Sequence, residues 1–299
     1  MTSLHGIIPP MITPFKENGD VDYGAFTRNI ERWNRDELSG FLVLGSNSEA
    51  AFLSYEEKLK LIELTVKNAV KGRTIIAGTG LESARETIRL TNAAAKLGAQ
   101  AALILTPFYY TDQMGDEAII AYFKEVADHS DIPILIYNVP KFTHVNVSVN
   151  VVKTLSEYPN IIGMKDSMGN IEQIAAFKKV VDSKFNLIVG TASALYPALK
   201  LGVRCGILAL SNCLPNQCAK IQTHFESGNM NDAEDIHKKI VPVNTMVAVT
   251  HGVPGLKYAS TLLGYEGGFV RSPLRPLNDS QKADVRKVLT DSGFLGPSK

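Results

Sequence analysis

The most informative segment of this chain reads Ile161-Ile162-Gly163-Met164-Lys165-Asp166-Ser167. It begins with apolar and β-branched residues, and turn residues bound it on both sides, namely Pro159-Asn160 and Gly169-Asn170. A short apolar run with such boundaries predicts a buried strand. Strands that are apolar throughout favour a parallel sheet covered by helices. The segment therefore indicates an α/β fold.

Lys165 stands near the C-terminal end of this predicted strand, where a charged side chain is costly. Burial disfavours the ammonium form of a lysine, and a neutral amine can attack a ketone to form a Schiff base. Two ordinary interpretations remain open at this point. The side chain can extend to solvent along its aliphatic stem, or it can pair with the neighbouring Asp166.

Seven other segments resemble this strand, and a predicted helix follows each of the eight. Two of the helices begin with capping-box sequences, Ser54-Tyr55-Glu56-Glu57 and Ser83-Ala84-Arg85-Glu86. Eight strand–helix units with short connections are the pattern of a (β/α)8 barrel, or TIM barrel, which typically needs about 250 residues. The predicted strands cover residues 6–14, 40–45, 74–78, 101–106, 133–139, 161–167, 185–190 and 205–210.

A doubly wound open sheet is the alternative architecture, and it often binds a nucleotide after its first strand. Here the first strand leads into Thr13-Pro14-Phe15-Lys16, which is not a glycine fingerprint. Gly78-Thr79-Gly80 begins a dinucleotide motif, but Ser83 occupies the position of the third glycine. The sequence therefore favours the barrel and disfavours a dinucleotide site.

No strand is predicted beyond about residue 231. Residues 232–249, 255–263 and 280–289 have helical patterns, and a loop rich in Gly and Pro covers residues 264–278. We therefore expect a catalytic barrel domain at 1–228 and a C-terminal helical domain at 229–299. Apolar helices beyond a complete barrel also offer surface for a homo-oligomer.

The composition is that of an ordinary globular protein, with 45% hydrophobic and 20% charged residues. A net charge of +1 gives no basic field to attract nucleic acid or an anionic membrane. No apolar run approaches the roughly 20 residues that span a bilayer, and the N-terminal residues do not read as a targeting segment. Three sparse cysteines without accompanying histidines predict neither disulfides nor a metal site. We therefore expect a cytoplasmic protein.

Polar and aromatic residues occupy the C-terminal ends of the predicted strands. These ends meet on one face of a barrel, so their side chains are expected to share a pocket. A lysine, phenols, hydroxyls and an amide suit carbonyl chemistry, with the amine as nucleophile and a phenol to transfer protons. Tyr109 and Tyr110 can equally be packing residues, and Ser46 and Asn47 can cap the next segment. The strand ends are Gly45-Ser46-Asn47-Ser48-Glu49, Thr106-Pro107-Phe108-Tyr109-Tyr110, Tyr137-Asn138-Val139-Pro140, Lys165-Asp166-Ser167 and Gly190-Thr191-Ala192.

The first four of these segments resemble, in order and spacing, the motifs of one enzyme superfamily. The matching motif around the lysine is Gly163-Met164-Lys165-Asp166-Ser167. Over nearly its whole length the chain is similar to the dihydrodipicolinate synthase / N-acetylneuraminate lyase superfamily of class I aldolases, which handle pyruvate. The resemblance implies a reaction on a small 2-oxo acid through a covalent imine, with no other cofactor.

The same resemblance implies a role for individual residues. Lys165 would form the Schiff base, and Tyr137 would act as general acid and base. Ser46 would belong to the proton relay and contact the substrate carboxylate. Tyr110 would reach into the site of a neighbouring subunit, so a tetramer or a dimer is expected. The other implied substrate-binding residues are Asn47 and Ser167 and, through backbone groups, Gly190 and Ile207.

Three positions depart from the lysine-biosynthesis branch of the superfamily. Phe142 stands where that branch has an arginine for the carboxylate of aspartate semialdehyde, and a phenyl ring cannot replace a bidentate guanidinium. The pair Ser46-Asn47 stands in place of two threonines and looks more like the 4-hydroxy-2-oxoglutarate aldolase branch. Animal members of the latter branch carry a mitochondrial targeting extension, so a mitochondrial location would require an upstream extension.

We therefore expect cleavage of 4-hydroxy-2-oxoglutarate to pyruvate and glyoxylate. The alternatives are 4-hydroxy-tetrahydrodipicolinate synthase activity and cleavage of 2-keto-3-deoxy sugar acids. A catalytically silent family member that binds a keto acid is a further alternative. The roles of Phe142 and His144 remain open in all of these cases.

Overall fold

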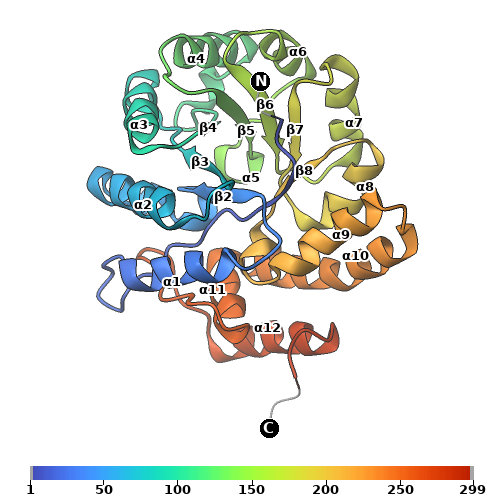
Figure 1. Cartoon of the computed structure of the whole chain (residues 1–299). Coiled ribbons are helices and arrows are strands. Elements are labelled where there is room, and N and C mark those ends of the chain that lie inside the picture. The colour runs from blue at the N-terminus through green and yellow to red at the C-terminus, as the bar shows by residue number, and fades with distance from the viewer. Residues whose placement is uncertain (1–2, 297–299) are drawn as a thin grey trace.

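The computed structural model describes residues 3–296, which form a ring of eight parallel strands with helices around it (Figure 1). The strand order β1-β8-β7-β6-β5-β4-β3-β2 confirms the predicted (β/α)8 barrel. Residues 1–2 and 297–299, at the outer ends of the two predicted domains, lie outside the described residues. The strands are β1 (Gly6–Ile8), β2 (Gly40–Val43), β3 (Thr74–Gly78), β4 (Ala101–Leu105), β5 (Ile134–Asn138), β6 (Ile161–Asp166), β7 (Asn186–Val189) and β8 (Cys205–Ile207).

Helices alternate with the strands, and capping side chains begin several of them. The Ser54 hydroxyl accepts from the Glu57 N–H and the Glu57 carboxylate accepts from the Ser54 N–H, so the first predicted capping box is complete. Ser83 also caps its helix, but the Glu86 carboxylate binds Arg89 instead, so the second box is half formed. The barrel helices are α1 (Tyr23–Trp33), α2 (Tyr55–Asn68), α3 (Ala84–Leu97), α4 (Asp116–Asp128), α5 (Pro140–Thr143), α6 (Val149–Ser156), α7 (Ile171–Val180), α8 (Leu195–Lys200) and α9 (Pro215–Glu226).

The barrel closes between β1 and β2, and both β1 and β8 are shorter than predicted. Pro9 and Pro10 have no N–H to continue the β1 ladder. The closure therefore uses Leu42, whose N–H donates to Pro9 and whose carbonyl accepts from Met11, at 3.0 and 2.9 Å. The strand β8 ends at Ile207, and a 3-10 turn at Ala209–Asn212 follows it.

The C-terminal part is helical, as predicted, but its first helix is interrupted. The helix α10 (Met230–Asn244) continues into a π-helix at Thr245–Thr250 instead of running to residue 249 as an α-helix, and α11 (Gly252–Leu262) and α12 (Asp279–Asp291) follow. Figure 1 shows these helices beside α1 and α9, and α10 packs along α9. The division into two domains at residue 228 stays a prediction.

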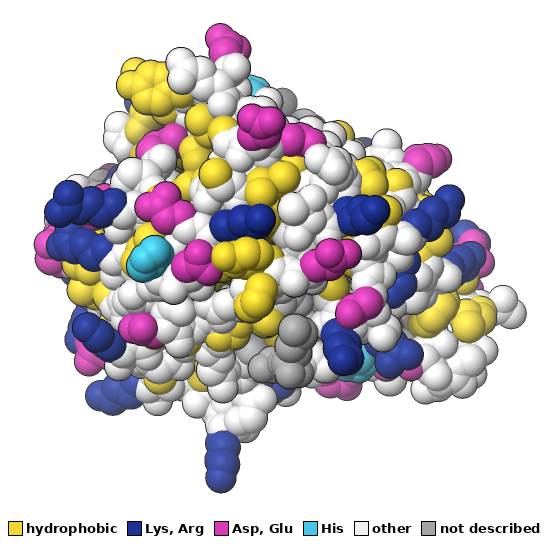
Figure 2. All heavy atoms as spheres, turned by 90° about the horizontal axis from the view of Figure 1, so that it is seen from above, with side chains coloured by type: hydrophobic (Ala, Val, Ile, Leu, Met, Phe, Trp, Pro, Cys, Tyr) yellow, Lys and Arg dark blue, Asp and Glu magenta, His cyan; other side chains and the backbone are white. Residues whose placement is uncertain are grey.

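Charged side chains of both signs are interspersed on the face that Figure 2 shows, without a large patch of one sign. This distribution agrees with the net charge of +1. Within residues 3–296, no helix combines the length and the apolar character that a membrane span requires.

Candidate active site

Lys165 and Tyr137 are partners in the ladder between β6 and β5, near the C-terminal ends of both strands. The Lys165 Nζ atom lies 4.2 Å from the centroid of the Tyr137 ring. Lys165 is 3% exposed and Tyr137 is 6% exposed, so the lysine does not extend to solvent. An amine and a phenol thus meet inside the mouth of the barrel.

Asp166 is not the partner of Lys165, because successive strand residues point to opposite faces. Its Oδ1 atom accepts hydrogen bonds from Asn138 and Gln173 at 2.7 and 3.0 Å. Burial raises the pKa of the Asp166 carboxyl, although these two hydrogen bonds act in the opposite direction. Since no ion pair joins Lys165 to Asp166 in the described part of the chain, neither ordinary interpretation of Lys165 holds.

Ser46 lies beside the phenol on the segment that follows β2. Its Oγ atom is 3.4 Å from the Tyr137 hydroxyl, at the long end of hydrogen-bond geometry. Ser46 and Asn47 belong to a 3-10 turn at Ser46–Ser48 whose N-cap is Gly45, so neither side chain caps that turn. Both residues are half-buried.

The surroundings of Tyr137 lower the pKa of its phenol. Burial alone would raise the pKa of the Tyr137 phenol. The positive charge of Lys165 and the hydroxyls of Ser46 and Ser167 act in the opposite direction, and together they lower the pKa of Tyr137 below its ordinary value. A phenol with a lowered pKa can release and recover a proton more readily near neutral pH.

Gly190 and Ile207 lie on the next two strand ends. The Gly190 N–H donates to the Asp166 carbonyl at 2.7 Å, and a Cβ atom on Gly190 would lie 2.0 Å from the Ser167 hydroxyl. The glycine therefore leaves room for that hydroxyl. Ile207 is fully buried, and its side chain belongs to the apolar cluster inside the barrel together with Tyr137.

The described structure does not bring Tyr110 or Phe142 into contact with Lys165. Tyr110 is 67% exposed, and its ring packs edge-on against Tyr109 with centroids 5.0 Å apart. Phe142 lies on α5 and is 51% exposed. His144 is the C-cap residue of that helix; it is also exposed and has a φ of 54°.

Thr106 belongs to the predicted strand end after β4, but the sequence assigned it no individual role. Its side chain is buried, and its hydroxyl has no hydrogen-bond partner within residues 3–296.

The structure also bears on the cysteines and on metal ligands. Cys205, Cys213 and Cys218 are free and buried, and burial raises the pKa of Cys205 and Cys213 to about 12. Within the described residues, no group of three or more His, Cys, Asp or Glu side chains is arranged to hold a metal ion.

The chain matches the model of the dihydrodipicolinate synthetase family over residues 3–292. It is 35% identical to a 4-hydroxy-tetrahydrodipicolinate synthase of Methanothrix thermoacetophila over 98% of both chains. It is also 35% identical to the enzyme of that name from Bartonella bacilliformis, over 98% of this chain and 99% of the relative. The dihydrodipicolinate synthase of Acinetobacter baumannii, solved in complex with pyruvate, superimposes with a TM-score of 0.93 at 29% identity, over 98% and 100% of the two chains.

These relatives confirm the predicted superfamily, whereas they give no support to the predicted 4-hydroxy-2-oxoglutarate aldolase branch. The barrel fold and the relatives agree with one another. The chain belongs to the dihydrodipicolinate synthetase family, and it is an enzyme of the class I aldolase type.

Proposed function

We propose that Lys165 forms an imine with the ketone of pyruvate or of a related 2-oxo acid, and that Tyr137 transfers the protons of the reaction. The buried lysine nitrogen 4.2 Å from the Tyr137 ring is the observation that carries this proposal. An amine nucleophile is most effective with a proton donor and acceptor beside it, and Tyr137 fills that role. Ser46, 3.4 Å from the phenol oxygen, would extend the relay.

The chemistry begins with attack of the neutral Lys165 amine on the ketone, which gives a carbinolamine. The Tyr137 phenol donates a proton to the departing hydroxyl, water leaves, and the iminium forms. The Tyr137 phenolate then removes a proton from C3, and the resulting enamine attacks an aldehyde whose oxygen takes up that proton. Water finally hydrolyses the product iminium, which releases the product and the Lys165 amine. The reverse sequence cleaves the same carbon–carbon bond and releases pyruvate. No cofactor enters this scheme.

The names of the relatives favour the 4-hydroxy-tetrahydrodipicolinate synthase reaction, in which pyruvate condenses with aspartate semialdehyde. Phe142 supports a second candidate, because an exposed phenyl ring offers no charge to the carboxylate of that aldehyde. The second candidate is cleavage of a 4-hydroxy-2-oxo acid, either 4-hydroxy-2-oxoglutarate or a 2-keto-3-deoxy sugar acid.

The remaining predicted residues fit the same scheme. Asn47 and Ser167 would donate to the substrate carboxylate, and Gly190 and Ile207 would contribute backbone groups. Phe108, Tyr109 and Tyr110 form an exposed aromatic cluster, which would be covered in a dimer or tetramer. Three buried free thiols suit the reducing cytoplasm.

The imine can be trapped by borohydride in the presence of pyruvate. We expect a pyruvate-derived mass on the peptide that contains Lys165, and no such mass without pyruvate or in Lys165→Met. A peptide that stays unmodified in the wild-type protein would refute the mechanism. Side-by-side assays with aspartate semialdehyde plus pyruvate and with the 4-hydroxy-2-oxo acids then distinguish the two candidate reactions.

A further inference from the structure

The segment that carries Ser46 and Asn47 lies between two strained residues. Leu44 and Glu49 have φ values of 62° and 55°, in the left-handed region that few residues with a side chain adopt. Such conformations persist where surrounding contacts enforce them, and they are common at functional sites. The contacts that enforce this segment therefore bear on the position of Ser46.

Glu49 is fixed by residues of the C-terminal part of the chain. One carboxylate oxygen lies 2.5 Å from the Lys257 Nζ atom on α11, and the other accepts from the Arg271 N–H at 2.8 Å. Glu49 is 4% exposed and Lys257 is 2% exposed, so solvent hardly screens the pair.

Lys257 is itself held in one place. Its ammonium donates to the Phe269 carbonyl at 2.6 Å and lies 4.5 Å from the centroid of the Phe15 ring. Burial lowers the pKa of Lys257 to about 8, although Glu49 acts in the opposite direction. A buried ion pair usually adds little stability compared with apolar side chains of the same volume. Stability alone therefore gives little reason for this pair.

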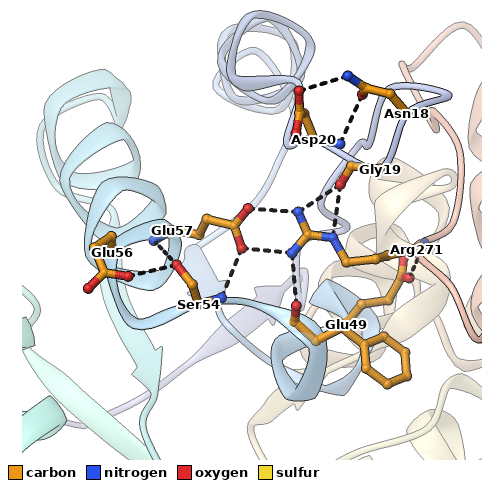
Figure 3. A network of polar contacts seen from close by, with 9 residues as sticks. Asn18, Gly19, Asp20, Glu49, Ser54, Glu56, Glu57 and Arg271 are labelled. Carbon is orange, nitrogen blue, oxygen red and sulfur yellow. Dashed lines mark hydrogen bonds and ion pairs between the residues drawn. The ribbon is translucent and has the colours of Figure 1, made fainter.

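Arg271 binds the polypeptide that follows Glu49 (Figure 3). Its guanidinium binds both carboxylate oxygens of Glu57 at 2.7 Å and donates to the Gly19 carbonyl. It also donates to the Phe52 carbonyl at 2.8 Å, just beyond Glu49. The C-terminal part thus holds the polypeptide that follows β2 at several points.

The other side of the segment is bonded within the barrel, where the Ser48 hydroxyl lies 2.6 Å from the Thr13 hydroxyl. Ser46 and Asn47 lie between these attachments. The 3.4 Å contact from Ser46 to Tyr137 leaves little tolerance, because a further displacement would end the hydrogen bond.

We propose that Lys257 is a positioning residue that acts through Glu49 to hold Ser46 within reach of Tyr137. The C-terminal helices would then be part of the catalytic apparatus, although they contribute no group to the reacting atoms. The inference rests on the proposed roles of Lys165, Tyr137 and Ser46.

The test follows the exchange of the C3 protons of pyruvate for deuterium in D2O by proton NMR. Exchange requires the imine and the enamine but no aldehyde, so it is independent of the physiological substrate. Lys257→Met leaves Glu49 unpaired and can impair folding. The double variant Glu49→Gln/Lys257→Met removes both charges at similar volume, so it is expected to fold. At saturating pyruvate we expect its exchange rate to fall about 100-fold, the cost of a small misplacement of a catalytic group.

A matched control is Arg28→Met, which also removes a bond between the barrel and the C-terminal part, to Glu266, but touches no residue of the Ser46 segment. Its exchange rate is expected to equal that of the wild type. A second comparison adds the double variant to Ser46→Ala. If Lys257 acts through Ser46, the exchange rate of this triple variant should be at most about twofold lower than that of Ser46→Ala alone, a difference no larger than the usual error of additivity.

The possible outcomes test the positioning role of Lys257 separately from the proposed function. A folded double variant that exchanges protons at the wild-type rate would overturn the positioning role and leave the imine mechanism intact. The same holds if the fold-losses in exchange rate of the double variant and of Ser46→Ala multiply when the substitutions are combined. A wild-type protein that neither exchanges pyruvate protons nor forms the Lys165 adduct would overturn the proposed function, and the positioning role with it.

Discussion

The Ser46 hydroxyl lies 3.4 Å from the Tyr137 phenol oxygen, although 91 positions separate the two residues in the chain. Ser46 follows β2 and Tyr137 lies on β5, and these two strands are not neighbours in the sheet. They meet because the C-terminal ends of all strands converge on one face of a barrel. At 3.4 Å, this contact leaves little tolerance for shifts of the loop that carries Ser46.

Removal of either hydroxyl should slow proton transfer. We expect Ser46→Ala and Tyr137→Phe each to reduce pyruvate proton exchange by about 100-fold or more, the usual contribution of a positioned acid or base. The unfolding midpoint should change little for Ser46→Ala, because the residue is only half-buried. NMR exchange rates and thermal unfolding measure both effects, and an unchanged rate in Tyr137→Phe would exclude the phenol as the acid and base.

Gly190→Ala tests the space beside Ser167. Its Cβ atom would lie 2.0 Å from the Ser167 Oγ and 2.7 Å from the Asp166 carbonyl oxygen, so the backbone must shift. We expect a loss of about 1–3 kcal/mol in the free energy of unfolding, as for other overpacked sites. Urea denaturation measures this loss.

Gly115→Ala is the matched control for that substitution. A Cβ atom on Gly115 would meet nothing within 4 Å, and the residue is the N-cap of α4. Its cost should stay at about 1 kcal/mol or less. Equal losses in the two variants would contradict the steric argument at Gly190.

Asp166→Asn should change how stability depends on pH. Burial raises the pKa of Asp166 in the folded protein above 3.8, so the folded state binds its proton more tightly than the unfolded state does. The stability from this protonation is complete below pH 3.8 and is lost as the pH rises through the folded-state pKa. Asparagine has no such loss.

We therefore expect the stability of Asp166→Asn, relative to the wild type, to increase from about pH 4 towards neutral pH. Urea denaturation of both proteins across this range measures the difference. Parallel pH profiles would show that Asp166 titrates alike in the folded and unfolded states.

Phe142→Arg tests the choice of aldehyde. Position 142 is exposed, so an arginine can be accommodated there, and its guanidinium can bind a carboxylate at two points. We expect kcat/KM for aspartate semialdehyde to rise about tenfold, which corresponds to one additional charge-assisted contact. Phe142→Lys, which adds charge without the planar fork, should gain less. If the wild type already condenses this aldehyde efficiently and Phe142→Arg does not raise kcat/KM, Phe142 does not restrict the choice of aldehyde.

Local sequence patterns predicted most of the fold. Apolar runs and helix caps depend on residues a few positions apart, so the eight units could be counted without coordinates. The predicted lengths of β1 and β8 were wrong, because Pro9 and Pro10 end one ladder early and the chain enters the 3-10 turn at Ala209–Asn212 soon after Ile207. The π-helix at Thr245–Thr250 had no signal in the hydrophobic pattern.

The sequence by itself determined that Lys165 and Ser167 lie at the end of one buried strand of a barrel and that Tyr137 and Ser46 lie at the ends of two others. Only the tertiary structure decided that Lys165 packs on Tyr137 instead of pairing with Asp166, and that Tyr110 and Phe142 face solvent within one chain. It alone joined Glu49 to Lys257. The physical reason is that strand and helix signals are local, whereas these contacts depend on the register and closure of the whole barrel.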